Sequence, residues 1–252
     1  MSALGLCSVL LTAAIPAAES AALPARVRRI VLHTLGGPFY RDPDRRWVFY
    51  SPAETFALWR RPGFGAHWIV WTDGSLWPRH PARGEPASFT LPVNGPADPA
   101  WRARLAREAA PVYAHVSAAN ADTVGIELAH SGRSDEAFPE AQLRSVAWLV
   151  RTLVEMSGGR LTDADVVGHK DLDDRPAYVD ESCRARCAFY VDDADRPFRR
   201  RVDPPESLFA DLAREGLAIP RPKDGDADLR RAETIAPGER PPAADPASLA
   251  RP

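Results

Sequence analysis

The sequence has little net charge and almost no lysine. Its 32 Lys and Arg residues nearly balance its 34 Asp and Glu residues, which leaves a formal net charge of −2. Nucleic-acid-binding domains usually carry a clear excess of positive charge, so this balance argues against that class of protein. Lysine occurs only at positions 170 and 223. An arginine at a position where lysine would suit the chemistry therefore need not indicate a different function.

The N-terminus lacks an apolar run long enough to form a helix that crosses a membrane. The run 4–15 is too short for a transmembrane helix, and no Lys or Arg precedes it. The small residues of 17–22 nevertheless suit cleavage by a signal peptidase. We therefore expect residues 1–25 to be an atypical signal peptide. The mature protein would be exported from a bacterial cell, to the periplasm or beyond.

Cysteine is scarce, with only Cys7, Cys183 and Cys187 in the chain. Cys7 would leave with the signal peptide, so Cys183 and Cys187 would remain as an even pair in an oxidising compartment. An even number of cysteines in such a compartment predicts a disulfide between Cys183 and Cys187, which would close a small loop. The alternative is a Cys-x-x-x-Cys metal clip, which would need two further ligands nearby.

Segments of strand and helix character alternate along the chain. The clearest helix has apolar residues at helical spacing and ends at Gly158-Gly159. Asp73-Gly74 indicates a hairpin, and Ser51-Pro52-Ala53-Glu54 is a capping box that begins a helix. The expected strands are 27–33, 66–71, 123–129 and 165–167, with 112–116 as a strand or a strand end, and the expected helices are 52–61, 99–109, 139–156 and 205–215.

This interleaving predicts one α/β domain, in which helices flank a central mixed β-sheet. We expect the domain to cover residues 26–217 and to be a monomer. From Pro220 onward the sequence is rich in proline and charge and has no aromatic residue. Residues 218–252 are therefore expected to form a disordered tail.

Two histidines follow apolar strands, and one aspartate precedes two prolines. His33 ends the strand 27–33, His169 follows Gly168, and Asp203 begins Asp203-Pro204-Pro205. Two imidazoles and a carboxylate suit a catalytic zinc ion, which takes three protein ligands and keeps a fourth position open. A lone histidine at a strand end is more often structural or solvated. Gly168 favours a site, because glycine lets the backbone approach another group closely.

Two more charged residues would complete such a site. Glu127 lies on the opposite face of its strand from Val124, Ile126 and Leu128. It would take a proton from the attacking water and pass it to the leaving amine. Arg201 shares a face with Asp203 if the chain is extended, and its fixed charge would stabilise an oxyanion. The alternatives are a solvated Glu127 and a surface Arg201.

In this order the segments resemble the type-2 N-acetylmuramoyl-L-alanine amidases, whose fold is shared with peptidoglycan-recognition proteins. The likeness covers about 27–212. It is carried by Ile30-Val31-Leu32-His33-Thr34, by Ala66-His67-Trp68-Ile69-Val70 with Asp73-Gly74-Ser75-Leu76-Trp77, by Asn120 with Val124-Gly125-Ile126-Glu127-Leu128, by Gln142, by Val167-Gly168-His169-Lys170-Asp171 and by Arg201-Val202-Asp203-Pro204.

The resemblance implies that His33, His169 and Asp203 bind Zn²⁺ and that Glu127 is the base. Arg201 stands where the family usually has lysine, and His115 resembles a position near the glycan cleft. Asn120 would contact substrate as well. The implied reaction is hydrolysis of the amide that joins the lactyl group of N-acetylmuramic acid to L-alanine, in peptidoglycan or in muropeptides.

The segment between His169 and Asp203 is longer than is typical of that family, so three other aspartates remain alternative ligands: Asp192, Asp193 and Asp195. Asp203 is preferred because only it stands in a basic-x-Asp-Pro context with a helix directly after it. Two other histidines remain: His67 is expected in the core, with a place beside the metal ligands as the alternative, and His130 is expected to face solvent.

Two rival functions follow from the same residues. A peptidoglycan-binding module on this fold would keep the groove and lose the zinc, and a zinc peptidase would cut within the stem peptide. The complete set of three candidate ligands favours an enzyme.

Overall fold

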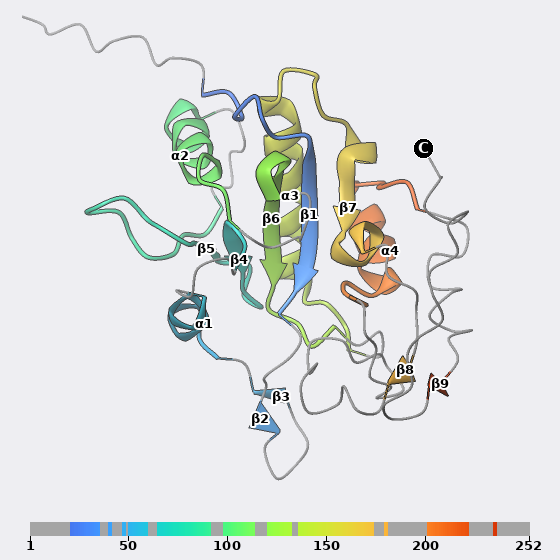
Figure 1. The fold of residues 1–252 in the computed structure, drawn as a ribbon. Helices are drawn as coiled ribbons and strands as arrows, with labels where there is room; N and C mark the ends of the chain where they lie inside the picture. Colours follow the sequence, from blue (N-terminus) through green and yellow to red (C-terminus); the bar gives the residue numbers. More distant parts are fainter. Residues whose placement is uncertain are drawn as a thin grey trace, which may run out of the picture.

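A five-stranded mixed sheet forms the centre of the protein, which is described by a computed structural model (Figure 1). The structure describes residues 21–35, 40–41, 47–48, 50–59, 65–91, 98–113, 120–132, 136–173, 179–180, 201–221 and 234–235. The sheet order is β5-β4-β6-β1-β7. Its strands are β1 (Arg29–Thr34), β4 (Trp68–Val70), β5 (Leu76–Pro78), β6 (Thr123–Leu128) and β7 (Val166–Gly168).

Four of the five strands are parallel, and β5 is antiparallel to β4. The turn between β4 and β5 contains Asp73 and Gly74, which confirms the hairpin expected there. Two short strand pairs lie outside this sheet, formed by β2 (Tyr40–Arg41) with β3 (Trp47–Val48) and by β8 (Val179–Asp180) with β9 (Thr234–Ile235). The α/β class and the mixed sheet are both confirmed.

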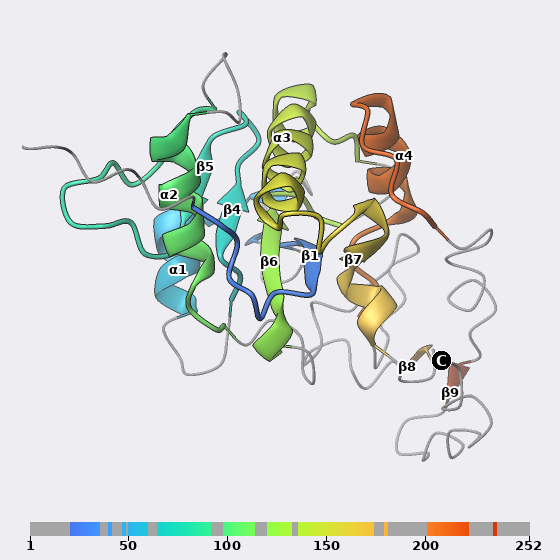
Figure 2. The same ribbon diagram turned by 90° about the horizontal axis from the view of Figure 1, so that it is seen from above.

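The helices pack against this sheet and against one another (Figures 1 and 2). The long helix α3 lies across the central strands, with α4 beside it. The α-helices are α1 (Pro52–Leu58), α2 (Pro99–Ala109), α3 (Glu140–Met156) and α4 (Glu206–Arg214), and the 3-10 helices are η1 (Asn120–Asp122), η2 (Asp163–Asp165) and η3 (His169–Leu172). The capping box at Ser51 does begin α1, as its sequence indicated.

The core lies between the sheet and α3. Strands that are covered on both faces read as nearly continuous apolar runs, and β1 and β6 have that composition. The apolar stripe of α3 completes the core, and its spacing is the reason that this helix was predictable. The fully buried members include Ile30, Leu32, Val124, Ile126, Leu128, Val146, Val150 and Leu153.

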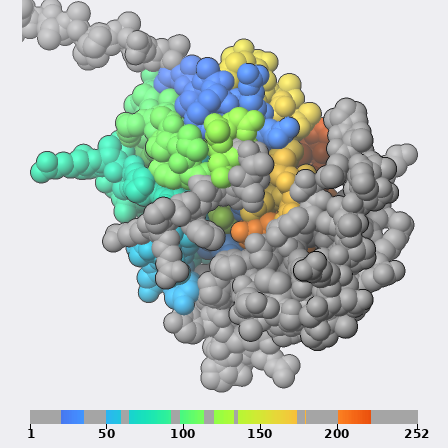
Figure 3. Space-filling view, in the orientation of Figure 1, coloured from blue at the N-terminus to red at the C-terminus, as the bar shows by residue number. Residues whose placement is uncertain are grey.

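The segment before β1 is part of the packed domain. Leu23 and Val27 are buried, and the Leu23 N–H donates to the Met156 carbonyl at 2.9 Å. The Arg160 guanidinium donates to the carbonyls of Leu23, Pro24, Ala25 and Val27. In Figure 3 the blue segment at the start of the described chain lies against green and yellow segments of the surface. These hydrogen bonds attach the segment before β1 to the end of α3 and to Arg160 just beyond it.

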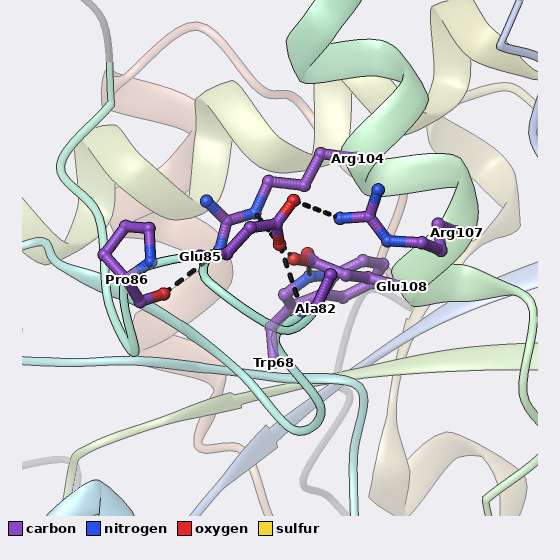
Figure 4. Close-up of polar contacts among 7 residues, drawn as sticks. All are labelled: Trp68, Ala82, Glu85, Pro86, Arg104, Arg107 and Glu108. Carbon is purple, nitrogen blue, oxygen red and sulfur yellow. Dashed lines mark hydrogen bonds and ion pairs between the residues drawn. The ribbon is translucent and has the colours of Figure 1, made fainter.

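Glu108 is a buried carboxylate that joins α2 to β4 (Figure 4). Its Oε2 accepts a hydrogen bond from Trp68 Nε1 at 2.6 Å, and its Oε1 accepts one from Arg104 Nε at 2.8 Å. Burial raises the pKa of Glu108, and the bonds from Arg104 and Trp68 oppose that rise. The carboxylate is thus held by two donors that have little access to water.

We expect Glu108→Ala to lower the free energy of unfolding by about 2–4 kcal/mol, because it leaves a buried indole N–H and a guanidinium without their acceptor. Urea denaturation measures this change. The matched control is Glu140→Ala, which removes an exposed carboxylate paired with Arg144 one helical turn away and should have little effect. Equal stabilities of the two variants would contradict this account of Glu108.

Candidate metal centre

The register of the parallel strands brings three polar side chains to one edge of the sheet. His33 on β1 is the Cα partner of Glu127 on β6. Leu32 is the partner of Gly168, the last residue of β7, so His33 and His169, the first residue of η3, also lie side by side. The carboxyl ends of β1, β6 and β7 point to this edge in Figure 1. Clefts beyond the carboxyl ends of parallel strands are common sites for ligands.

Asp203 joins the two histidines from a distant part of the chain. His33 Nδ1 lies 2.9 Å from His169 Nδ1, and Asp203 Oδ2 lies 3.9 Å from the first and 3.7 Å from the second. The two imidazole rings meet edge to face, with their centroids 4.5 Å apart. All three residues are buried. Three ligand atoms of the expected types are thereby gathered within 4.8 Å of one another.

These separations fit a tetrahedral metal ion. Ligand atoms about 2.0–2.1 Å from a tetrahedral zinc lie about 3.3 Å apart. The observed distances fall on either side of that value, so small side-chain rotations would bring all three atoms into place. The second oxygen of the carboxylate, Asp203 Oδ1, is buried and accepts no hydrogen bond from the residues that the structure describes. The residues present therefore fit a zinc ion.

Hydrogen bonds from two backbone N–H groups hold Asp203 in place. The Thr34 N–H points to Asp203 Oδ2 at 3.4 Å, and the Lys170 N–H donates to the Asp203 carbonyl at 2.8 Å. Burial by itself would raise the pKa of Asp203, but the imidazole of His169, Arg201 and the Thr34 N–H outweigh burial and lower it. Sequence reasoning missed Thr34, whose contribution comes from its backbone and has no side-chain signal.

Glu127 lies next to this group with a carboxylate that is largely desolvated. The residue is partly exposed as a whole, yet Oε2 is buried and accepts no hydrogen bond from the described part of the chain. Burial, together with the nearby Asp203, raises the pKa of Glu127 to about 8, and Arg201 opposes that rise. A bound cation would favour the ionised carboxylate. The Glu127 carboxylate is therefore suited to act as a general base and then as a general acid.

Arg201 approaches the same site from the side of Asp203. Its Nη1 lies 3.9 Å from Asp203 Oδ1, and its side chain is partly buried. The Arg201 N–H donates to Asp173 Oδ2 at 2.7 Å, which fixes the backbone just before Asp203. A permanent positive charge thus lies beside the three candidate ligands.

Other predicted residues do not gather at this edge, or lie outside the described residues. Asn120 is in η1, before the first residue of β6, whereas Glu127 is near the end of that strand. At about 3.3 Å per residue, the two are on the order of 20 Å apart, so Asn120 does not lie at the metal centre, and its expected contact with substrate stays a prediction. His115, Cys183 and Cys187 lie outside the described residues, as do the alternative aspartates Asp192, Asp193 and Asp195.

Both remaining histidines with a prediction are buried. The prediction for His130 was wrong, since it is fully buried, stacks on Phe138, accepts from the Gly132 N–H and lies 3.0 Å from the Glu136 carbonyl. Partners within its own loop make that burial possible. His67 is in the core as expected: its Nδ1 accepts from the Gly125 N–H, and its Nε2 lies 3.0 Å from the Pro111 carbonyl.

His67 should make the stability fall in mild acid. Burial lowers its pKa to about 3, from about 6.5 in the unfolded chain, and the nearby Arg26 and Arg79 act in the same direction. The unfolded state therefore binds more protons between these values, and stability is complete above pH 6.5 and is lost as the pH falls. We expect a loss of about 2 kcal/mol between pH 6.5 and 5 from this residue.

Urea denaturation at several pH values measures this effect. The comparison is His67→Gln, which does not titrate and retains a donor for the Pro111 carbonyl. The difference between the two proteins removes the contributions of other groups. Parallel curves of stability against pH would show that His67 does not cause the loss.

Comparison with known proteins places the chain in a family. A family model described as N-acetylmuramoyl-L-alanine amidase matches residues 23–183, which is more than half of the chain. The chain belongs to the N-acetylmuramoyl-L-alanine amidase family. The resemblance of its motifs to that family is thus confirmed. The matched region includes His33, Glu127 and His169 but ends before Asp203, so the position of Asp203 in this amidase fold comes from the structure.

No curated protein sequence matches the chain. Solved structures that resemble it include the amidase AmiD from E. coli, in complex with anhydro-N-acetylmuramic acid-L-Ala-D-gamma-Glu-L-Lys. AmiD is 16% identical, and the match covers 81% of this chain and 62% of AmiD with a TM-score of 0.41. AmpDh3 from Pseudomonas aeruginosa is 15% identical. The match covers 90% of this chain and 97% of AmpDh3, with a TM-score of 0.35. The endolysin amidase LysCS from Clostridium intestinale is 18% identical. The match covers 59% of this chain and 73% of LysCS, with a TM-score of 0.34.

Proposed function

We propose that the protein is a zinc-dependent N-acetylmuramoyl-L-alanine amidase, which hydrolyses the amide between N-acetylmuramic acid and L-alanine in peptidoglycan or muropeptides. The observation that carries this proposal is the buried group of His33, His169 and Asp203 with the carboxylate of Glu127 beside it. Membership in an amidase family supports the choice of substrate.

In this proposal His33, His169 and Asp203 hold the zinc ion. A zinc ion bound there supplies a Lewis acid for the scissile carbonyl and lowers the pKa of the attacking water to about 7. Glu127 accepts the proton of that water and delivers it to the departing amine of L-alanine, which a carboxyl group with a raised pKa does readily. Arg201 contributes a fixed positive charge towards the developing oxyanion.

Digestion of purified peptidoglycan by the purified full-length protein tests the proposal. Mass spectrometry should detect intact stem peptides that begin with L-alanine, together with glycan strands that have lost their peptides. A chelator should abolish the reaction, and added Zn²⁺ should restore it.

Other outcomes would replace the proposal with one of its rivals. Peptides cut within the stem would indicate a peptidase. Unchanged muropeptides from a protein that sediments with peptidoglycan would indicate a binding module. Activity that survives complete removal of the metal, verified by metal analysis, would exclude the zinc mechanism.

We also propose that an export signal precedes the packed domain at the N-terminus, that the mature protein acts outside the cytoplasm, and that Cys183 and Cys187 form a disulfide there. None of the described helices has both the length and the hydrophobicity that a membrane crossing requires. Leu23 lies within the predicted 1–25, but it is buried and its N–H donates to the Met156 carbonyl, so its contacts favour a signal that ends before residue 23. At the other end, Ile219 is buried, which supports a domain that continues a few residues beyond 217.

A further inference from the structure

Four charged side chains form a compact, electrically neutral cluster beside the metal centre. The Arg221 guanidinium bonds to Asp171 through Nη1 and Nη2 and to Glu206 through Nη2 and Nε, at distances of 2.5–3.1 Å. Lys170 Nζ lies 3.1 Å from Glu206 Oε1. Lys170 is buried, and the guanidinium lies 3.8 Å from the centre of the Phe209 ring. We call Lys170, Asp171, Glu206 and Arg221 the charge cluster.

The charge cluster joins the two segments that carry His169 and Asp203. Lys170 and Asp171 follow His169 directly in η3, and Glu206 begins α4 three residues after Asp203. Arg221 bonds to both segments at once through Asp171 and Glu206. A change in its position would therefore shift one ligand relative to the other.

The backbone between the cluster and the ligands leaves little room for such a shift. Asp171 Oδ2 also accepts a hydrogen bond from the Gly168 N–H at 2.6 Å, just before His169. A Cβ atom at Gly168 would lie 2.9 Å from Pro204 Cδ, next to Asp203. The cluster and this close contact thus both constrain the spacing of the ligand pair.

The geometry points to Arg221 as a positioning residue for the metal centre: it holds His169 and Asp203 at the spacing that a zinc ion needs. This inference rests on the proposed function. Arg221 itself touches neither ligand, so it acts through Asp171 and Glu206. Groups that hydrogen-bond to metal ligands and orient them typically contribute about 10–100-fold to metal affinity, and we take this range as the expected effect of losing the cluster's support.

The test is the zinc affinity of the full-length Arg221→Gln variant, measured by competition with a chromophoric chelator. We expect its Kd for Zn²⁺ to rise by about 10–100-fold. The visible absorption spectrum of the Co²⁺-loaded protein should change as well, because it reports the arrangement of the ligands around the metal. A merely structural arginine would lower stability without moving that spectrum.

The matched control is Arg151→Gln. Arg151 is exposed, and its Nη1 donates to the Glu215 carbonyl at 2.9 Å, so it also anchors the residues after α4, but away from η3. We expect its zinc Kd and Co²⁺ spectrum to match the original protein. Glu206→Gln is a second variant of the cluster, with an expected rise in Kd in the same direction, for use if Arg221→Gln does not fold.

Two results would overturn the inference alone. One is a folded cluster variant with an unchanged zinc Kd and Co²⁺ spectrum. The other is an equal loss of affinity in Arg151→Gln, which would indicate general loosening of the domain. An original protein that binds no zinc would instead remove the proposed function, and this inference with it.

Discussion

Glu127→Gln lowers the rate of muropeptide hydrolysis by roughly 10²–10⁴-fold in the proposed mechanism, which is the usual contribution of a positioned general base. Glutamine has nearly the same shape but cannot accept and return a proton. Glu127 is the partner of His33 in the sheet and is not one of the three gathered ligands. Zinc binding should therefore survive the substitution, so that the loss appears in turnover and not in metal content.

Product release followed by mass spectrometry, together with metal analysis of the same preparation, measures both quantities. Glu140→Gln is a suitable control, because Glu140 is a highly exposed glutamate on α3. If the Glu127 variant keeps most of its activity, the base lies elsewhere. If it loses zinc as well, Glu127 belongs to the metal site.

His169→Ala should weaken zinc binding by roughly 10²–10³-fold and abolish hydrolysis. Apparent binding free energies of about 10–16 kcal/mol for four ligands correspond to about 2.5–4 kcal/mol for each. His169 is buried, and its Nδ1 is central to the group, close to both His33 and Asp203. Competition with a chelator measures the affinity.

His80→Ala provides the comparison, because His80 is exposed and lies outside the metal centre. It should bind zinc as tightly as the original protein. Undiminished zinc affinity in His169→Ala would show that the ion, if one binds, is held by other residues. Activity of that variant without zinc would contradict the proposed mechanism directly.

Much of the fold could be predicted from local patterns. The apolar spacing of 139–156 predicted the helix observed at Glu140–Met156, and the Asp-Gly turn predicted the hairpin of β4 and β5. These features depend on residues close together in the chain. The chemical types of the candidate ligands could be read in the same way, from His33 and His169 at the ends of apolar strands.

Predictions about which residues are buried and which residues meet in space were less secure. His130 seemed a surface residue, but backbone groups of its own loop satisfy both ring nitrogens and allow full burial. Asn120 is close to Glu127 in sequence, but the extended strand between them separates the two in space. Nothing near Arg221 in the sequence indicates its bonds to Asp171, fifty residues earlier.

The sequence by itself determined the alternation of strands and helices, the family and a set of residues capable of binding zinc, because period and side-chain chemistry are local properties. Only the tertiary structure decided that His33, His169 and Asp203 meet and that Glu127 lies beside them. That meeting depends on the pairing of β1 with β6 and β7 and on the return of the chain to Asp203, which are contacts between residues far apart in the sequence.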